Sequence, residues 1–444
     1  MANKVKTIIL IVLIMVISGC SKAPKTIESS KDSQNDNKVD ASIAEASITN
    51  LRVVTNKTNR GLMLSGVGTG DGYYDSIPWT EEMYDEESPW IHVSNLIYID
   101  YESQTRIYLC GVPGCAHNSE NCTSYIRYPR GIDLFTNSSG TILFCMASGA
   151  AGGEIYSDDD LGRIYQMNLD GSNKKELLKL KANESFSISD PVIADEMHIY
   201  VCIDVMRDAI IGPEKELREI NVNDGTVSKL INLKQEEIVT SAYDDNIVIA
   251  DWSSYDKTMK ATIRGYSISK KVVSVLYEGE TGDYFIAEDN YAFYSKRKDD
   301  NSGIITVIDL KDGDIKQIEN IPHEAVGIVF IYNYFDNRIH WNYIDKSEVG
   351  ISHEYIVDID TGEFIKRTLY YNDVNNIPQM VQIIAEIKDS FLVLMGTENS
   401  KISMVDGEGI PHIYDFPNKP TYALISKDDY WNNIPNYIGI ENTF

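Results

Sequence analysis

Seven short apolar segments that look like strands recur along this chain at a nearly regular distance. Successive segments begin 45, 57, 49, 44, 47 and 53 residues apart, which is the range of period that propeller blades show. One small sheet cannot cover both of its faces, whereas several sheets stacked around an axis shield one another. The repeat therefore predicts an all-β fold, a β-propeller of seven blades, with six or eight blades as alternatives and a stack of β-sandwiches as the competing architecture. The segments begin at Asn95, Gly140, Met197, Asn246, Asn290, Asn337 and Ser390.

Tight turns recur in step with these segments. Asp-Gly or Thr-Gly pairs follow an alternating run at residues 170–171, 224–225, 312–313, 361–362 and 406–407, and Lys270-Lys271 fills the remaining gap. Because glycine adopts the positive φ that a two-residue hairpin turn requires, each repeat is predicted to be a meander of antiparallel strands that ends in a hairpin. Strand candidates remain at residues 62–64, 73–74 and 422–425. We expect them to complete one blade from the two termini.

The first twenty residues are typical of an export signal. Lys4 and Lys6 precede ten apolar residues from Ile8 to Ile17, and Ser18-Gly19-Cys20 follows. At about 1.5 Å per residue, such a helix covers roughly half of a ~30 Å hydrocarbon core, which disfavours an uncleaved membrane anchor. The cysteine resembles that of a bacterial lipobox. This resemblance implies a signal peptide at residues 1–19 and a lipid on Cys20 that holds the protein on the outer face of the cytoplasmic membrane, with its chain outside the cell.

The remainder divides into a tether and a folded domain. Residues 20–50 are rich in Ser, Lys, Asp, Asn and Ala and contain no aromatic residue. They bury too little surface to offset the entropy of ordering, and are predicted to be a disordered tether after the lipidated cysteine. Residues 51–444 are predicted to form the propeller domain. The formal net charge of −27 argues against a nucleic-acid partner, which would require clustered positive charge.

One cluster in the sequence has metal-like chemistry: Cys110, Cys115, His117 and Cys122. It follows an alternating run, where other repeats have their turn, so we expect an insertion that replaces a hairpin. Three thiolates and an imidazole form a complete tetrahedral set for a structural zinc ion, the one cofactor that the sequence suggests. A disulfide, for example between Cys115 and Cys122, and three free thiols are the alternatives.

Motifs of known enzymes are incomplete in this sequence. It contains no Gly-x-Ser-x-Gly elbow, and neither of its His-Glu pairs has the second histidine of a zinc protease helix. No catalytic residue is assigned, and the spacing leaves open whether His198, His340 and Tyr343 meet at a channel mouth. The glycine-rich residues 66–72 lack a phosphate-loop pattern and predict a turn. Cys145 and Cys202 lie in apolar strands and are expected to be buried and inert.

Several features together resemble the β-propeller lipoproteins that are common in clostridia and related Gram-positive bacteria. They are the lipobox, the tether, the loop at residues 109–117 with Cys122 after it, the Asn-Leu-Asp-Gly-Ser turn at 168–172 and the ending at 423–430. The repeats are also similar to the TolB-like propeller class. The Cys/His loop is the most specific part of this resemblance, which implies a propeller outside the cytoplasmic membrane. Because those lipoproteins are largely uncharacterised, the resemblance implies no activity and no site residue.

Two functions fit these observations. The favoured one is a non-catalytic binding module at the cell surface, whose loops at one end of the propeller bind a protein, peptide or glycan. Trp79, Trp90, Trp252 and Trp431 could stack on such a ligand, although aromatic residues mostly serve burial. The alternative is a polysaccharide-cleaving enzyme, a lyase or hydrolase, with polar side chains converging at one mouth of the central channel.

Overall fold

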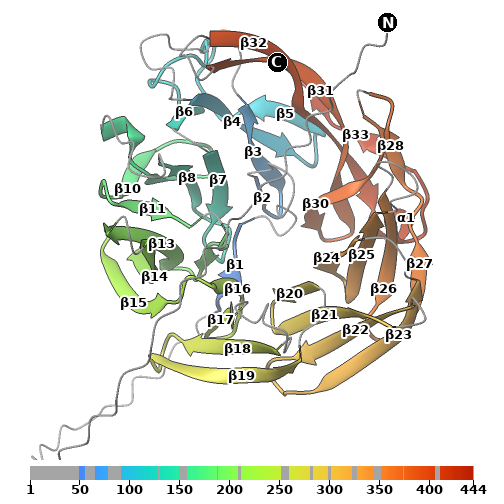
Figure 1. The fold of residues 1–444 in the computed structure, drawn as a ribbon. Helices are drawn as coiled ribbons and strands as arrows, with labels where there is room; N and C mark the ends of the chain where they lie inside the picture. Colours follow the sequence, from blue (N-terminus) through green and yellow to red (C-terminus); the bar gives the residue numbers. More distant parts are fainter. Residues whose placement is uncertain are drawn as a thin grey trace, which may run out of the picture. The chain divides into compact units, whose positions relative to one another are not determined.

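A ring of sheets makes up the part of the chain that the structure describes. The computed structural model divides into two units, Met1–Ala46 and Ser47–Phe444, and the described residues belong to the second. They form seven sheets of four or more strands, arranged as the blades of a propeller (Figure 1). The predicted seven-bladed β-propeller is therefore confirmed. The described residues are 50–55, 66–78, 92–128, 131–149, 158–187, 189–208, 212–251, 260–280, 284–298, 302–322, 328–344, 352–373, 375–405 and 411–443.

The expected signal peptide, Cys20 and nearly all of the tether lie outside these described residues. Within the described ranges, the structure contains no helix with the length and apolar character needed to cross a membrane.

Blades 1 to 3 contain the first strands of the chain and its last one. Blade 1 consists of β2 (Val67–Gly68), β3 (Gly72–Pro78), β4 (His92–Asp100), β5 (Thr105–Tyr108), β6 (Tyr125–Tyr128) and β34 (Glu441–Asn442). Blade 2 consists of β7 (Gly131–Thr136), β8 (Leu143–Ser148), β9 (Arg163–Met167) and β10 (Lys175–Lys179). Blade 3 consists of β1 (Arg52–Val53), β11 (Glu184–Phe186), β12 (Ile193–Ala194), β13 (His198–Asp208), β14 (Gly212–Asn221) and β15 (Val227–Leu233).

Blades 4 to 7 are regular four-stranded meanders. Blade 4 consists of β16 (Glu237–Tyr243), β17 (Asn246–Asp251), β18 (Lys260–Ser267) and β19 (Val272–Glu280). Blade 5 consists of β20 (Tyr284–Glu288), β21 (Tyr291–Arg297), β22 (Ser302–Asp309) and β23 (Ile315–Pro322). Blade 6 consists of β24 (Ile328–Phe335), β25 (Arg338–Ile344), β26 (Ser352–Asp358) and β27 (Phe364–Lys366). Blade 7 consists of β30 (Gln382–Ile387), β31 (Ser390–Val405), β32 (Pro411–Ser426) and β33 (Ile438–Gly439).

Three shorter elements complete the described structure. A two-stranded ribbon of β28 (Tyr370–Asn372) and β29 (Pro378–Met380) precedes blade 7. The helix α1 (Lys427–Trp431) follows β32, and a 3-10 turn at Asp158–Asp160 precedes β9.

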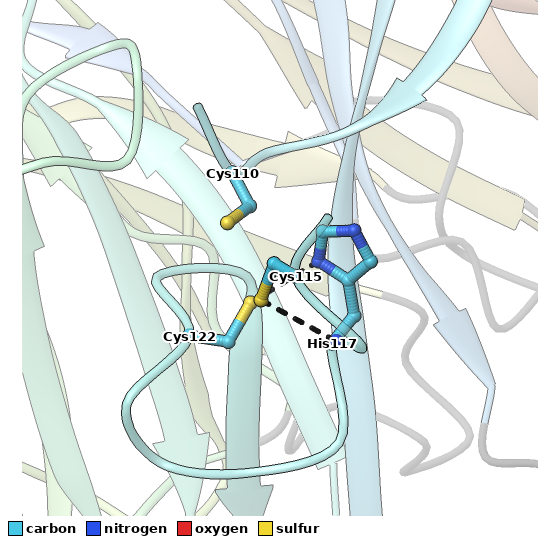
Figure 2. Close-up of side chains that lie close together, drawn as sticks. All are labelled: Cys110, Cys115, His117 and Cys122. Atoms are coloured by element: carbon cyan, nitrogen blue, oxygen red, sulfur yellow. Dashed lines mark hydrogen bonds between the residues drawn. The ribbon is translucent and has the colours of Figure 1, made fainter. Parts of the chain in front are cut away.

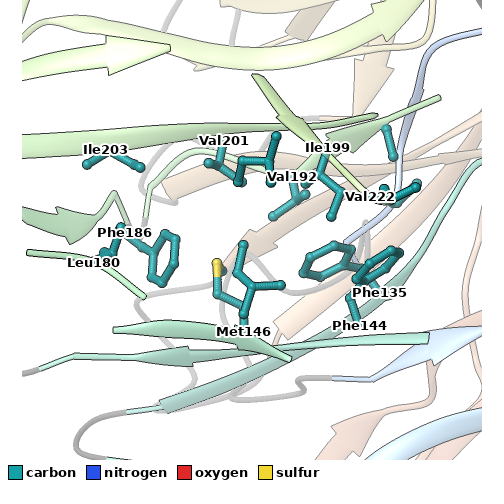
Figure 3. Packing of buried hydrophobic residues seen from close by; sticks show 14 of the residues in the cluster. Phe135, Phe144, Met146, Leu180, Phe186, Val192, Ile199, Val201, Ile203 and Val222 are labelled. Atoms are coloured by element: carbon teal, nitrogen blue, oxygen red, sulfur yellow. The ribbon is translucent and has the colours of Figure 1, made fainter. Parts of the chain in front are cut away.

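The seven repeated segments found in the sequence belong to central strands of the blades, namely β4, β8, β13, β17, β21, β25 and β31. Such a strand is apolar throughout because both of its faces are covered. In β13, Ile199, Val201 and Ile203 face a hydrophobic cluster shared with blade 2 (Figure 3). The alternate residues Tyr200 and Cys202 face a cluster shared with blade 4, as the two-residue period of a strand requires.

Each junction between neighbouring blades has its own core. The described residues form seven clusters of buried hydrophobic side chains, one at each of the seven junctions around the ring. At the junction of blades 2 and 3, the rings of Phe135 and Phe144 stack with their centroids 5.3 Å apart. Burying one such side chain stabilises the fold by about 1.5–3 kcal/mol. The unit Ser47–Phe444 thus carries its own continuous set of cores, as an independently folding domain does.

Several predicted hairpin turns link the last two strands of a blade. Gly171, Gly225, Gly313 and Gly362 have φ values of +78°, +71°, +79° and +75°, in the region that glycine adopts without strain. In blade 4 the turn instead has Lys271 at φ +55°. The pair at 406–407 lies outside the described residues. The glycine-rich stretch at 66–72 is a turn between β2 and β3, where the Thr69 N–H donates to the Gly72 carbonyl at 2.8 Å.

The ring closes differently from the prediction. Tyr73 lies in β3 of blade 1, whereas Tyr422 lies in the third strand of blade 7, which pairs with β31 along its length. The expectation that residues 73–74 and 422–425 share one blade is therefore wrong, and residues 62–64 lie outside the described part. The C-terminal β34 instead supplies an outer strand to blade 1 and pairs in parallel with β5. At the other end, β1 joins blade 3 through β12.

Candidate metal centre

The four Cys/His residues lie in an insertion within the strand of blade 1 that follows β4. Both β5 and β6 pair with the same strand, β4: Ile97 is opposite Tyr108, and Asn95 is opposite Tyr125. Between them, Leu96 accepts a hydrogen bond from the Leu109 N–H at 2.9 Å and donates one to the Ser124 carbonyl at 2.7 Å. The chain from Cys110 to Thr123, called the insertion below, therefore leaves the sheet and returns to it at one residue.

This placement corrects one detail of the sequence interpretation. The alternating run that ends before Cys110 suggested that the loop replaces a plain hairpin. The loop instead interrupts the strand that pairs with β4, because β6 resumes this pairing after the loop. After β6 the chain enters blade 2, and β34 pairs with β5 at the outer edge of blade 1.

The side chains of Cys110, Cys115, His117 and Cys122 gather at one point of the insertion (Figure 2). Their candidate ligand atoms all lie within 4.8 Å of one another. The His117 Nδ1 is 3.3 Å from the Cys122 Sγ, and the His117 N–H donates to the Cys115 Sγ at 3.4 Å. In a tetrahedral zinc site with Zn–S bonds of ~2.3 Å, two sulfurs stand about 3.8 Å apart. The four residues are thus close to the spacing that a bound metal imposes.

Tyr108 and Ser124, which lie before and after the insertion, both contact the cluster. The ring of Tyr108 lies against the imidazole of His117, with centroids 4.3 Å apart. Cys122 is only 2% exposed, and its sulfur is 3.0 Å from the Ser124 hydroxyl, which donates to the Asn95 side-chain carbonyl at 3.0 Å. Hydrogen bonds of this kind, one shell out from the ligands, orient the ligands of metal sites.

Blade 2 also contacts the insertion. The ammonium group of Lys174 donates to the carbonyl of Tyr125 at 2.8 Å and lies 3.5 Å from the carbonyl of Cys122. Gly171 stands so close to Leu109 that a Cβ on it would be 2.8 Å from the Leu109 carbonyl oxygen. The insertion is therefore packed against the second blade as well as anchored in the first.

The pKa values of three cluster residues depart from their usual values. Burial opposes ionisation of the Cys110 thiol, but hydrogen bonds from the Val112 N–H and from the other two thiols outweigh it and lower its pKa. Burial raises the pKa of Cys122 and lowers that of His117. His117 is thus held neutral, which is the form in which an imidazole binds a metal ion.

This arrangement suits a metal ion better than a disulfide. All five cysteines among the described residues are free thiols: Cys110, Cys115, Cys122, Cys145 and Cys202. Because all four candidate ligands come from the protein, a tetrahedral ion here would have no open position for a substrate. The cluster could therefore hold a structural metal ion.

Other residues singled out in the sequence lie apart from this cluster. Cys145 and Cys202 are buried as expected, and burial raises the pKa of Cys145 to about 12. His198 in blade 3 forms ion-pair contacts with Asp195 and Glu219, each at 3.3 Å.

The remaining candidates pack within blades 6 and 7 or lie outside the described residues. His340 in blade 6 is 1% exposed and contacts Glu354. Trp431 packs in the core at the junction of blades 6 and 7. The side chain of Tyr343 is not described, and Trp79, Trp90 and Trp252 lie outside the described residues.

Sequence reasoning missed the residues that support the cluster. Tyr108 and Ser124 flank the insertion at the points where it leaves and rejoins the sheet. Their positions, two residues from the first and the last cysteine, were the available signal. The role of Leu96 could not be found in this way, because it depends on strand pairing with a distant segment.

No protein-family model and no curated protein matches this sequence. Among solved structures, the chain is similar to an acylaminoacyl peptidase in complex with Z-Gly-Gly-Phe-chloromethyl ketone (TM-score 0.48, 12% identity, 86% of this chain and 55% of that one). It is also similar to the β-propeller domain of the Trilobed protease from Pyrococcus furiosus (TM-score 0.44, 10% identity, 83% and 99%). A third similar structure is TolB from Acinetobacter baumannii (TM-score 0.34, 11% identity, 82% and 76%).

One of these three structures, the Trilobed protease domain, is described as a β-propeller. This chain spans 55% of the length of the acylaminoacyl peptidase. At such identities the likeness concerns the fold alone.

Proposed function

We propose that this protein is a cell-surface lipoprotein whose propeller acts as a non-catalytic binding module for a protein, peptide or glycan. The observation that carries the proposal is the insertion at Cys110–Thr123. The insertion leaves the sheet and rejoins it beside Leu96. Four of its side chains cluster together, and Val112 within it is 59% exposed. A loop that is already ordered loses less entropy when it binds a partner, and binding residues commonly lie on loops of a rigid scaffold.

The proposed location rests on the N-terminal sequence. Removal of residues 1–19 and attachment of lipid at Cys20 would leave the propeller on a flexible tether, outside the cytoplasmic membrane. The test is detergent phase partitioning of the full chain expressed in a Gram-positive host. We expect the unaltered chain to enter the detergent phase. The Cys20→Ala variant should carry no lipid and stay in the aqueous phase. A Cys20→Ala variant that still carries lipid would contradict this assignment.

Zinc is the metal we propose for the cluster. Thiolate ligands select soft or borderline ions, and a set of three cysteines and one histidine is a common structural zinc site. The ion would fix the insertion, since unpaired loop residues otherwise gain conformational entropy by leaving the surface.

The positions of the two histidines support a binding role over the alternative, a polysaccharide-cleaving enzyme. His198 and His340 lie in blades 3 and 6, which are not neighbours in the ring, and each contacts a carboxylate of its own blade. Their contacts are those of structural residues within blades.

The experiment that tests the binding role removes the insertion. Joining Leu109 directly to Ser124 deletes Cys110–Thr123, and both flanking residues already bond to Leu96. Binding of the fragment 47–444 would be measured on glycan arrays and against peptides from exported proteins. We expect a specific ligand that the deletion variant no longer binds and that the control Ile365→Lys, an exposed residue on β27, still binds. No specific ligand for the unaltered fragment, or equal loss in the control, would overturn the proposal.

A further inference from the structure

The outer edge of blade 4 is an apolar strand with no described partner on one side. β19 is the last strand in the order β16-β17-β18-β19, and among the described residues it pairs only with β18. Figure 1 shows it on the outer side of the ring. Its side chains Val272, Val273 and Val275 are 51%, 42% and 59% exposed.

The outer strands β10, β15 and β23 contain lysine residues, whereas β19 contains none. The sequence of β10 is KELLK, that of β15 is VSKLINL, and that of β23 is IKQIENIP, whereas β19 begins VVSVLY before its first charge at Glu278. Lysine on an edge strand discourages pairing with another chain, because pairing would bring its charge against the incoming strand. Within the same molecule, β19 is thus an edge without this protection.

The charges that flank β19 are self-complementary. Lys270 and Lys271 precede the strand and Glu278 lies near its end, all three exposed. If two copies pair in antiparallel fashion about a two-fold axis at Ser274, Val273 of each copy is opposite Val275 of the other. The turn residues Lys270 and Lys271 of one copy then lie at the same end of the paired strands as Glu278 of the other. Opposite charges and β-branched pairs across strands both stabilise a sheet.

We propose that β19 is a dimerisation edge that pairs with β19 of a second copy of this chain, joining two blades into one continuous sheet. The interface would be isologous, as in most homodimers. The register between β18 and β19 shifts beside Val275, so the uninterrupted part of the edge, Val272–Val275, is short and the dimer is weak. At an ionic strength of about 150 mM the Debye length is about 8 Å, so the other negative charges of the two copies are largely screened.

Sedimentation of the fragment 47–444 tests this proposal. Over about 1–100 µM at this ionic strength, we expect the mass to rise from that of one chain toward that of two. The variant Val275→Lys should remain a monomer, because its lysine would face Val273 of the other copy. The control Ile315→Lys changes a residue that is 58% exposed on β23 and should dimerise normally. A monomer at every concentration, or equal effects of the two substitutions, would overturn the proposal.

A charge exchange tests the register. Lys270→Glu and Glu278→Lys should each weaken the dimer by about tenfold, since each places two like-charged pairs across the interface. The double variant should recover the original dissociation constant. Additive weakening in the double variant would rule out this pairing.

Discussion

At the scale of single residues, Tyr422 forms a buried hydrogen bond across the junction where the ring closes. Its hydroxyl donates to the Asp75 carboxylate at 2.5 Å, from blade 7 to blade 1, and Asp75 is 2% exposed. Removing the Tyr422 hydroxyl takes one hydrogen-bond donor from the buried Asp75 carboxylate. Such a loss lowers the stability of the folded state by about 1–3 kcal/mol. We therefore predict that Tyr422→Phe lowers the free energy of unfolding by this amount, measured by chemical denaturation.

The matched control lies against the same hydrophobic cluster. The Tyr101 hydroxyl is buried and has no hydrogen-bond partner among the described residues. Tyr101→Phe removes an unsatisfied polar atom and should leave the stability unchanged or raise it. Equal destabilisation by the two substitutions would show that the hydrogen bond to Asp75 does not stabilise the closure.

Asp133 in β7 predicts a specific pH dependence. Burial raises its pKa to about 6, above the value of about 3.9 in an unfolded chain. The folded state therefore binds the proton more tightly, and this carboxyl reduces stability as the pH rises from about 4 to above 6. Asp133→Asn should raise the free energy of unfolding by up to about 3 kcal/mol at pH 8, with no gain at pH 4. Thermal denaturation at both pH values measures this, and a gain that is the same at both would contradict the assigned cause.

At the scale of elements, the short strand β34 connects the C-terminus to blade 1. The Glu441 N–H donates to the Gln104 carbonyl at 2.8 Å, and the Thr443 hydroxyl donates to the Arg106 carbonyl at 2.8 Å. Deleting residues 441–444 should lower the melting temperature, because a few hydrogen bonds of about 1 kcal/mol each are lost. The double variant Glu441→Ala and Asn442→Ala keeps the backbone bonds and should melt close to the unaltered chain. A deletion without effect would show that β34 does not contribute to closure.

The elements that the sequence predicted are those with local signals. Central strands such as β13 are apolar on both faces, and turns such as Asp224-Gly225 need a positive φ, so both leave a mark in a short stretch of residues. β34 is two residues long and polar, and its partner β5 is more than three hundred residues away. The sequence also did not predict that one strand is split into β5 and β6. An alternating run of residues has the same pattern whether its strand ends there or is interrupted by a loop.

The candidate site was predicted in its members but not in its setting. The spacing of Cys110, Cys115, His117 and Cys122 identified four side chains that the fold brings together. Their attachment to Leu96 and the contacts of Lys174 come from strand pairing and from a neighbouring blade. Such contacts depend on the tertiary structure, which residue patterns along one segment do not record.

At the scale of the whole molecule, blade 1 is where several features meet. It contains the first long strands, receives the C-terminal β34, and carries the insertion between β5 and β6. A metal ion that binds the folded insertion and not the unfolded chain would stabilise this blade by mass action. The metal site and the closure of the ring are thus expected to be coupled, since β5 takes part in both.

Metal analysis combined with thiol counting tests directly whether these four residues hold a structural metal ion. For the fragment 47–444 we expect about one zinc ion per chain, and no reactive cluster thiols until a chelator is added. Cys122→Ala should lose the metal, whereas Cys145→Ala, which removes a buried thiol elsewhere, should keep it. A metal-free fragment whose mass reveals a disulfide among Cys110, Cys115 and Cys122 would show that these residues do not form a metal site.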